Sequence, residues 1–199
     1  MFCCCDDART PRFPRAGGRP GLTLLEVMIA IAIIAILAAT VAPNFIGALD
    51  RKRVDASAEA LVEIMEAMTT MRLDNQDWPG SISHMAEPIT TSMTNVCGNG
   101  YPTGKVNNWE GPYLDRPIPA SGLPIGVGIA EDVFVREVVS GNDAYLKIQI
   151  TDVSEEDAIA LNHVLDADSS ATGGAFRWNT PADAEGMVTA FYLRPIRGC

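Results

Sequence analysis

The feature that most constrains this chain is an apolar stretch near its N-terminus, which runs from Gly21 to Ala42. Between Leu24 and Ala42 the stretch carries one charged residue, Glu26. Folded as a helix with a rise of 1.5 Å per residue, the apolar run would be about 30 Å long, the thickness of the hydrocarbon core of a bilayer. The sequence therefore predicts a membrane-spanning helix over residues 22–43.

Two features distinguish this segment from an ordinary anchor. An ionised carboxylate such as that of Glu26 costs about 2.5–3.5 kcal/mol in hydrocarbon on insertion scales, even where a helix N-terminus eases it, so we expect it to have a partner. A leader ahead of the segment ends at Pro20-Gly21. By the positive-inside rule its arginines should keep it on the cytoplasmic side. These are Arg9, Arg12, Arg15 and Arg19.

The residues after the glycine resemble a known processing signal. Gly21 and the following Leu-Thr-Leu-Leu-Glu-Val of residues 22–27 look like the prepilin peptidase signature of type IV pilins and of type II secretion pseudopilins. The resemblance implies cleavage between Gly21 and Leu22, where most members have Phe, and N-methylation of Leu22. It also implies that Glu26 pairs with the free amine of a neighbouring subunit, and that Pro43 is the family's helix-kinking proline.

Other kinds of N-terminal segment fit the pattern less well. A secretory signal has an apolar region of about 7–15 residues followed by its cleavage site, whereas here the glycine precedes a longer run. A plain signal anchor would keep its leader. A lipoprotein would have its cysteine at the end of the apolar segment, and Cys3, Cys4 and Cys5 lie before it.

Charge and cysteine content narrow the function further. The leader, residues 1–21, holds four of the 15 basic and two of the 25 acidic residues, so the mature chain would carry 11 basic and 23 acidic side chains. Such an excess of acid argues against a nucleic-acid partner, because phosphates are bound mainly by Lys and Arg. Cleavage would also remove three cysteines and leave Cys97 and Cys199. In an oxidising compartment we expect these two to form a disulfide worth about 4–5 kcal/mol, with two unpaired thiols as the alternative.

The rest of the chain reads as a helix followed by a globular head. Residues 44–77 continue the helix, because apolar side chains recur mostly at steps of three or four and Trp78-Pro79-Gly80 cannot extend it. Residues 78–199 form the head, in which residues 80–124 are a long Gly- and Pro-rich loop and a candidate contact surface. The expected apolar stripe of the helix consists of Leu49, Val54, Leu61, Ile64, Met65, Met68 and Leu73.

The head should be an antiparallel sheet. Runs rich in Val and Ile predict strands, and Ser154 followed by three acids predicts a short helix over residues 154–166. The fold class is therefore α+β, with a long N-terminal spine helix packed on a C-terminal antiparallel sheet, as the resemblance to type IV pilins also implies. The predicted strands are residues 125–130, 133–139, 144–150, 175–178 and 187–193.

Groups that could carry chemistry are few. His84 and His163 lack the spacing of metal ligands, and Gly98 to Lys105 fails as a phosphate loop. Asp166 and Asp168 begin like an oxygen-ligand loop and are weak candidates for calcium, which major pseudopilins hold in a C-terminal loop; a plain acidic helix end is the alternative. No other cofactor is expected.

We therefore expect a structural filament subunit without enzymatic turnover. It would self-assemble with the help of prepilin peptidase and an inner-membrane assembly platform, waiting in the inner membrane with its head in the periplasm. The sequence favours a type IV pilus-like filament used for adhesion or motility. The alternatives are a pseudopilin of a type II secretion system, in a periplasmic pseudopilus, and a membrane-anchored binding domain that does not assemble.

Overall fold

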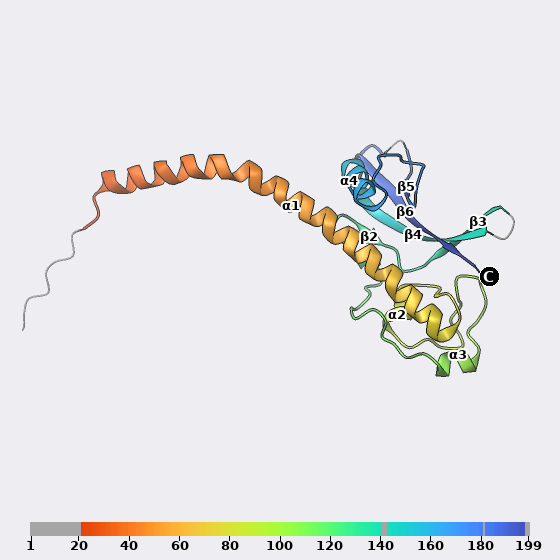
Figure 1. The fold of residues 1–199 in the computed structure, drawn as a ribbon. Coiled ribbons are helices and arrows are strands. Elements are labelled where there is room, and N and C mark those ends of the chain that lie inside the picture. Colours follow the sequence, from red (N-terminus) through yellow and green to blue (C-terminus); the bar gives the residue numbers. More distant parts are fainter. Residues whose placement is uncertain (1–20, 141–142, 181, 198–199) are drawn as a thin grey trace, which may run out of the picture. The chain divides into compact units, whose positions relative to one another are not determined.

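The computed structural model describes residues 21–140, 143–180 and 182–197, and leaves the side chains of residues 41–46, 139–140 and 143 undescribed. The chain divides into two compact units, Met1–Phe45 and Ile46–Cys199. The long helix α1 (Leu24–Asn75) begins in the first unit and ends in the second (Figure 1). It ends before Trp78-Pro79-Gly80, as the sequence predicts.

The described part of the first unit is the beginning of α1, and its large apolar side chains are exposed. None of the helices in the described ranges is both long and apolar enough to cross a membrane. The sequence predicts such a segment at residues 22–43. The side chains at its end, residues 41–43, lie outside those described. The exposed side chains are Leu24, Leu25, Val27, Met28, Ile29, Ile31, Ile33, Ile34, Ile36 and Leu37.

In the second unit, α1 buries one face against a sheet. Five members of the predicted apolar stripe are in the core, namely Val54, Leu61, Ile64, Met65 and Met68, and Met71 joins them. The prediction is wrong at Leu49 and Leu73, which are 45% and 73% exposed. Leu73 follows Met71 by two residues, or about 200° of helix, so the two side chains lie on opposite faces.

All strand pairings in the sheet are antiparallel, which confirms the predicted α+β class. Strands follow the order β1-β2-β4-β6-β5, and β3 pairs with β4 alongside β2. The long pair β4 and β6 forms the middle, and Leu146, Ile148 and Ile150 of β4 point into the core. The strands are β1 (Leu123–Pro124), β2 (Ile129–Ala130), β3 (Val135–Ser140), β4 (Asp143–Ser154), β5 (Phe176–Trp178) and β6 (Met187–Ile196).

The predicted strand over residues 125–130 is wrong for its first four residues, because β2 covers only Ile129–Ala130. Gly126 has a φ of 101°, and a Cβ there would lie 2.8 Å from the carbonyl oxygen of Arg53 on α1. This close approach lets the buried Ser57 hydroxyl donate to the carbonyl of Ile125 and accept from the N–H of Val127, at 3.0 Å for the second bond. The segment is therefore a turn that fixes α1 to the sheet edge.

Three short helices complete the described part of the head. Helix α4 (Glu155–Leu165) starts as predicted, because the Ser154 hydroxyl accepts the N–H of Asp157 at 3.1 Å. Helices α2 (Ser83–Ala86) and α3 (Thr103–Asn107) lie in the segment predicted as a loop, and they are too short to show a helical period. The segment is tied to the core by buried side chains, among them Ile82, Met85 and Ile89.

Candidate functional site

The predicted processing site lies in an accessible stretch just before α1. Gly21 and Leu22 are both exposed, Leu22 to 75%. A Cβ added at Gly21 would meet no atom within 4 Å, so the described fold does not itself require glycine there. A need for glycine at this position would therefore come from recognition by another molecule. Residues 1–20, the remainder of the predicted leader, lie outside the described residues.

Glu26 lies in the first turn of α1, where Thr23 caps the helix. The Thr23 hydroxyl accepts the N–H of Glu26 at 3.2 Å, and the Thr23 carbonyl accepts the N–H of Val27 at 3.2 Å. Sequence reasoning missed this cap, although the Thr-x-x-Glu spacing is its usual signal. Glu26 is exposed and makes no ion pair within the described part of the chain. Its carboxylate is thus free to receive a cation from outside the chain.

Pro43, the predicted kink, lies within α1, and its side chain is outside those that the structure describes. The kink stays a prediction. A proline at this position cannot donate the backbone hydrogen bond to the residue four places earlier, which is the physical reason to expect a bend.

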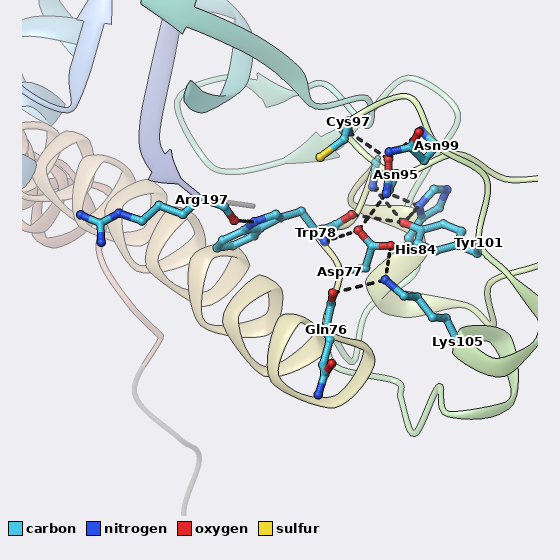
Figure 2. Close-up of polar contacts among 11 residues, drawn as sticks. Gln76, Asp77, Trp78, His84, Asn95, Cys97, Asn99, Tyr101, Lys105 and Arg197 are labelled. Atoms are coloured by element: carbon cyan, nitrogen blue, oxygen red, sulfur yellow. Dashed lines mark hydrogen bonds and ion pairs between the residues drawn. The ribbon is translucent and has the colours of Figure 1, made fainter. Parts of the chain in front are cut away.

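The segment after α1 is held by a polar network centred on Asp77 and Asn95 (Figure 2). Asp77 Oδ1 accepts from the N–H of Trp78 at 3.0 Å and from the Asn95 side-chain amide at 2.8 Å. Asp77 Oδ2 pairs with Lys105 at 2.7 Å. The Asn95 Oδ1 atom accepts from the N–H of Cys97 at 3.0 Å. Side chains and backbone from the end of α1 to α3 are thereby joined.

This network also meets the C-terminal end of the described chain. The Trp78 indole N–H donates to the carbonyl of Arg197 at 3.0 Å (Figure 2). The Arg72 guanidinium lies over the Trp78 ring, 5.5 Å from the ring centroid. Cys97 is part of a disulfide, and its predicted partner Cys199 lies outside the described residues. Arg197, two residues before Cys199, is thus held beside the network that also contains Cys97.

His84 is a structural histidine of the loop. Its Nδ1 atom accepts the N–H of Gly80 at 3.2 Å and lies 3.0 Å from the Tyr101 hydroxyl. Burial lowers the pKa of His84, and the nearby Asp132 carboxylate opposes this only in part. Burial also raises the pKa of Tyr101. Burial therefore favours the neutral form of both side chains, and both accept the N–H of Gly80 and fix the turn there. His163, in contrast, is exposed on α4.

The two calcium candidates are engaged in hydrogen bonds of the loop after α4. Asp166 Oδ2 accepts the N–H of Phe176 at 2.7 Å, while Asp168 Oδ1 accepts the Asn162 amide at 2.6 Å and the N–H of Ser170 at 2.9 Å. No group of three or more His, Cys, Asp or Glu side chains in the described ranges could hold a metal. One oxygen of each carboxylate is thus already engaged by neutral N–H donors, and the calcium site stays a prediction.

Comparison with known proteins points to one kind of protein. A family model described as the prokaryotic N-terminal methylation motif matches residues 18–42. The type II secretion system core protein G of Vibrio cholerae is 32% identical over 96 residues, which are 48% of this chain and 60% of that protein. Its namesakes from Klebsiella pneumoniae and Pectobacterium carotovorum are 29% and 28% identical over 84 and 82 residues, 42% and 41% of this chain.

These alignments cover 60% of the Vibrio and Klebsiella proteins and 53% of the Pectobacterium protein, so the chain matches little more than half of each relative's length. No solved structure matches the chain significantly.

Proposed function

We propose that this chain, a member of the type IV pilin and type II secretion pseudopilin family, is a pseudopilin: a structural subunit of a type II secretion filament. The observation that carries the proposal is the methylation motif over residues 18–42, combined with similarity to type II secretion core protein G from several bacteria. The proposal assigns the chain no enzymatic turnover.

The sequence alone favours a subunit of a surface pilus used for adhesion or motility and gives the pseudopilin as an alternative. The proposal prefers the pseudopilin. The relatives named above are all secretion proteins, and they support the interpretation that the sequence ranks second. The pilus subunit has no comparable support.

Assembly would begin with processing. Cleavage between Gly21 and Leu22 would free an amine on Leu22, which prepilin peptidase would then methylate. The exposed carboxylate of Glu26 lies one helical turn further along and has no ion-pair partner in the described chain, so it can receive the amine of a neighbouring subunit. A charge pair withdrawn from water in this way is strongly directional and would set the register between subunits.

The apolar side chains of the first unit would supply the attraction. Ten large apolar residues between Leu24 and Leu37 are exposed in the single chain. Burying one such side chain contributes about 1.5–3 kcal/mol. We propose that lipid of the inner membrane covers this segment, residues 22–43, before assembly and that other subunits cover it afterwards, with an inner-membrane platform moving it between the two.

The head would face the periplasm, an oxidising compartment where disulfides persist. We propose that Cys97 is paired there with Cys199. The support is that Cys97 is disulfide-bonded and that the Arg197 carbonyl is held by Trp78 in the same network. A nucleic-acid partner is not part of the proposal, because the mature chain has 11 basic against 23 acidic residues.

The testing experiment is intact-mass analysis of the chain from the membrane fraction and from filaments sheared off the cell surface, with export measured in cells lacking the chain. A pseudopilin is expected as a methylated chain starting at Leu22, retained with the membrane, whose loss blocks export. The same processed chain abundant in the sheared fraction, with export intact, would instead identify a surface pilus subunit.

Processing needs its own control. Changing Gly21→Ala should leave unprocessed precursor of unaltered fold, because the added Cβ meets no atom within 4 Å. Normal processing of that variant, or an unprocessed wild-type chain, would remove the basis of the proposal.

A further inference from the structure

The outward face of the second half of α1 carries charges of opposite sign at its two ends. Four charged residues lie within about 60° of one another on the helix, on the side opposite the core residues. The one nearest the first unit is a cation and the three that follow are acids. They are Lys52, Glu59, Glu63 and Glu66, with the exposed Asp55 about 20° outside this sector.

The acidic end of this face borders a groove of about 440 Å³ between α1, α4 and β6. The apolar lining includes Val62, which is 44% exposed, and Val164, which is 51% exposed. The rim is made by the three glutamates. Glu63 is paired with Arg116, whereas Glu59 and Glu66 have no ion-pair partner in the described chain. The groove therefore offers apolar walls and unneutralised acid.

The basic end is the run Arg51-Lys52-Arg53, the single place in the sequence with three consecutive cations. All three side chains are exposed. Arg53 makes a long ion pair with Asp50, at 3.9 Å, and donates to the Gly126 carbonyl at 3.4 Å. Arg51 and Lys52 make no ion pair within the described ranges. They hold most of the unpaired positive charge on this helix.

We propose that the groove binds Arg51 and Lys52 of a second copy of this chain, lying parallel and displaced by about 15 Å along α1. The displacement follows because Lys52 of one copy must lie beside Val62 of the other, and ten residues of helix span about 15 Å. Long cationic side chains lay their methylene stems on apolar surface while their charged ends reach acids at the rim. The inference rests on the proposed function, because it describes how filament subunits meet.

A second copy fits the groove better than another partner for a reason of charge. The mature chain is strongly acidic, so most of its surface would be repelled by the glutamates, and the run of three cations is the exception. A parallel displacement leaves one basic end and one acidic groove free at opposite ends of the pair. Contacts of this head-to-tail kind repeat without closing and so produce a filament.

Cysteine crosslinking in the cells that make the filament tests the contact. The full chain would carry Lys52→Cys and Val62→Cys, and mild oxidation should give a ladder of dimers and larger species. A disulfide needs Cα atoms within about 7 Å, so the ladder reports the stagger directly. The matched control, Lys52→Cys with Thr70→Cys, uses an exposed position on the same face but 18 residues away, or about 27 Å. It should stay monomeric.

Charge reversal tests the physical cause. Arg51→Glu with Lys52→Glu should reduce the assembled fraction by about tenfold or more, because like charges would then face each other across the contact. Adding Glu59→Lys and Glu66→Lys to the same chain should restore assembly. The matched control is Glu87→Lys with Glu185→Lys, at two exposed positions away from the groove. It changes the net charge of the chain as much as Glu59→Lys with Glu66→Lys does, and it should leave assembly intact.

Three outcomes overturn the inference: a ladder from the Lys52 and Thr70 pair but not from the Lys52 and Val62 pair, assembly unaffected by charge reversal, or no rescue by the double swap. If Glu26→Ala still blocks assembly in those cells, the proposed function stands and only this contact is wrong. An unprocessed wild-type chain, together with no ladder from the Lys52 and Val62 pair, would remove both.

Discussion

The two halves of α1 use the same helical backbone in different ways. From Leu24 to Leu37 nearly every large side chain is apolar and exposed, whereas from Val54 to Met71 apolar side chains occupy one face and are buried. The second half has its partner within the chain, in the sheet of the head. The first half has none among the described residues, and in the proposed function other molecules cover its apolar surface. One half of the helix stabilises the fold, and in the proposed function the other half serves assembly.

The largest expected effect comes from truncating one large apolar side chain to alanine in each half of α1 and comparing the loss of stability. Met68→Ala removes a fully buried side chain and should lower the free energy of unfolding by about 2–5 kcal/mol. Ile33→Ala, which truncates a side chain that is 53% exposed, should leave it unchanged within about 0.5 kcal/mol. Urea unfolding of the detergent-solubilised full chain, followed by tryptophan fluorescence, measures both. Equal destabilisation would show that the first half is also packed within the chain.

Glu26→Ala sharpens the contrast in the opposite direction. The carboxylate is exposed and has no ion pair in the described chain, so the unfolding free energy should not change. Assembly should fall by about tenfold or more, because the amine of the neighbouring subunit would be left unpaired among apolar side chains. Intact mass should still show cleavage after Gly21. Efficient incorporation of the variant into filaments would contradict the role given to Glu26.

The next prediction concerns pH and should be confined to the head. His84 has a lowered pKa in the folded state, so the folded chain favours its neutral form. Its contribution to stability is complete above the unfolded pKa of about 6.5 and is lost as pH falls from there towards the folded pKa, by at most about 1.4 kcal/mol per pH unit. Urea midpoints at pH 8 and pH 5 measure this.

The matched controls are the two histidine variants. His84→Gln should flatten the dependence below pH 6.5, although it also weakens the Gly80 turn. His163→Gln removes an exposed histidine on α4 and should leave the pH dependence as it is. If His163→Gln flattened the curve instead, the Gly80 turn would not be the acid-sensitive element.

The smallest expected effect is that of calcium. Because backbone and amide N–H groups already engage one carboxylate oxygen of Asp166 and one of Asp168, we expect chelation to leave the melting temperature of the wild-type chain unchanged. Asp168→Ala should lower the free energy of unfolding by about 1 kcal/mol, since the buried Asn162 amide loses its 2.6 Å bond to the carboxylate. It keeps only longer bonds to the carbonyls of residue 168, at 3.2 Å, and of Ser170, at 3.4 Å. A clear loss of stability on chelation, absent in Asp168→Ala, would instead assign a calcium site to this loop.

Patterns between residues close together in the sequence predict much of the helical structure. The spacing of Ile64, Met65 and Met68 predicts a helix with one buried face, and Ser154 followed by acids predicts the start of α4; the structure confirms both. Both signals depend on neighbours within one or two turns, which a sequence shows directly. The Thr23 cap, a signal of the same range, was overlooked.

Predictions failed where a distant part of the chain decides. Residues 125–130 are rich in strand-forming side chains, yet Gly126 turns there because the backbone of Arg53 and the hydroxyl of Ser57 lie against it. The fold also joins Asp166 to Phe176 and Asp168 to Asn162 by hydrogen bonds that the sequence does not show, while the calcium site at these two acids stays a prediction.

By itself, then, the sequence determined the family motif from Gly21 to Glu26, the long helix and the α+β class, because each depends on composition or on periods of a few residues. Only the tertiary structure decided which face of α1 is free, that its glutamates border a groove with α4, and that Trp78 holds Arg197. These features join residues far apart in the chain, and only packing brings such residues together.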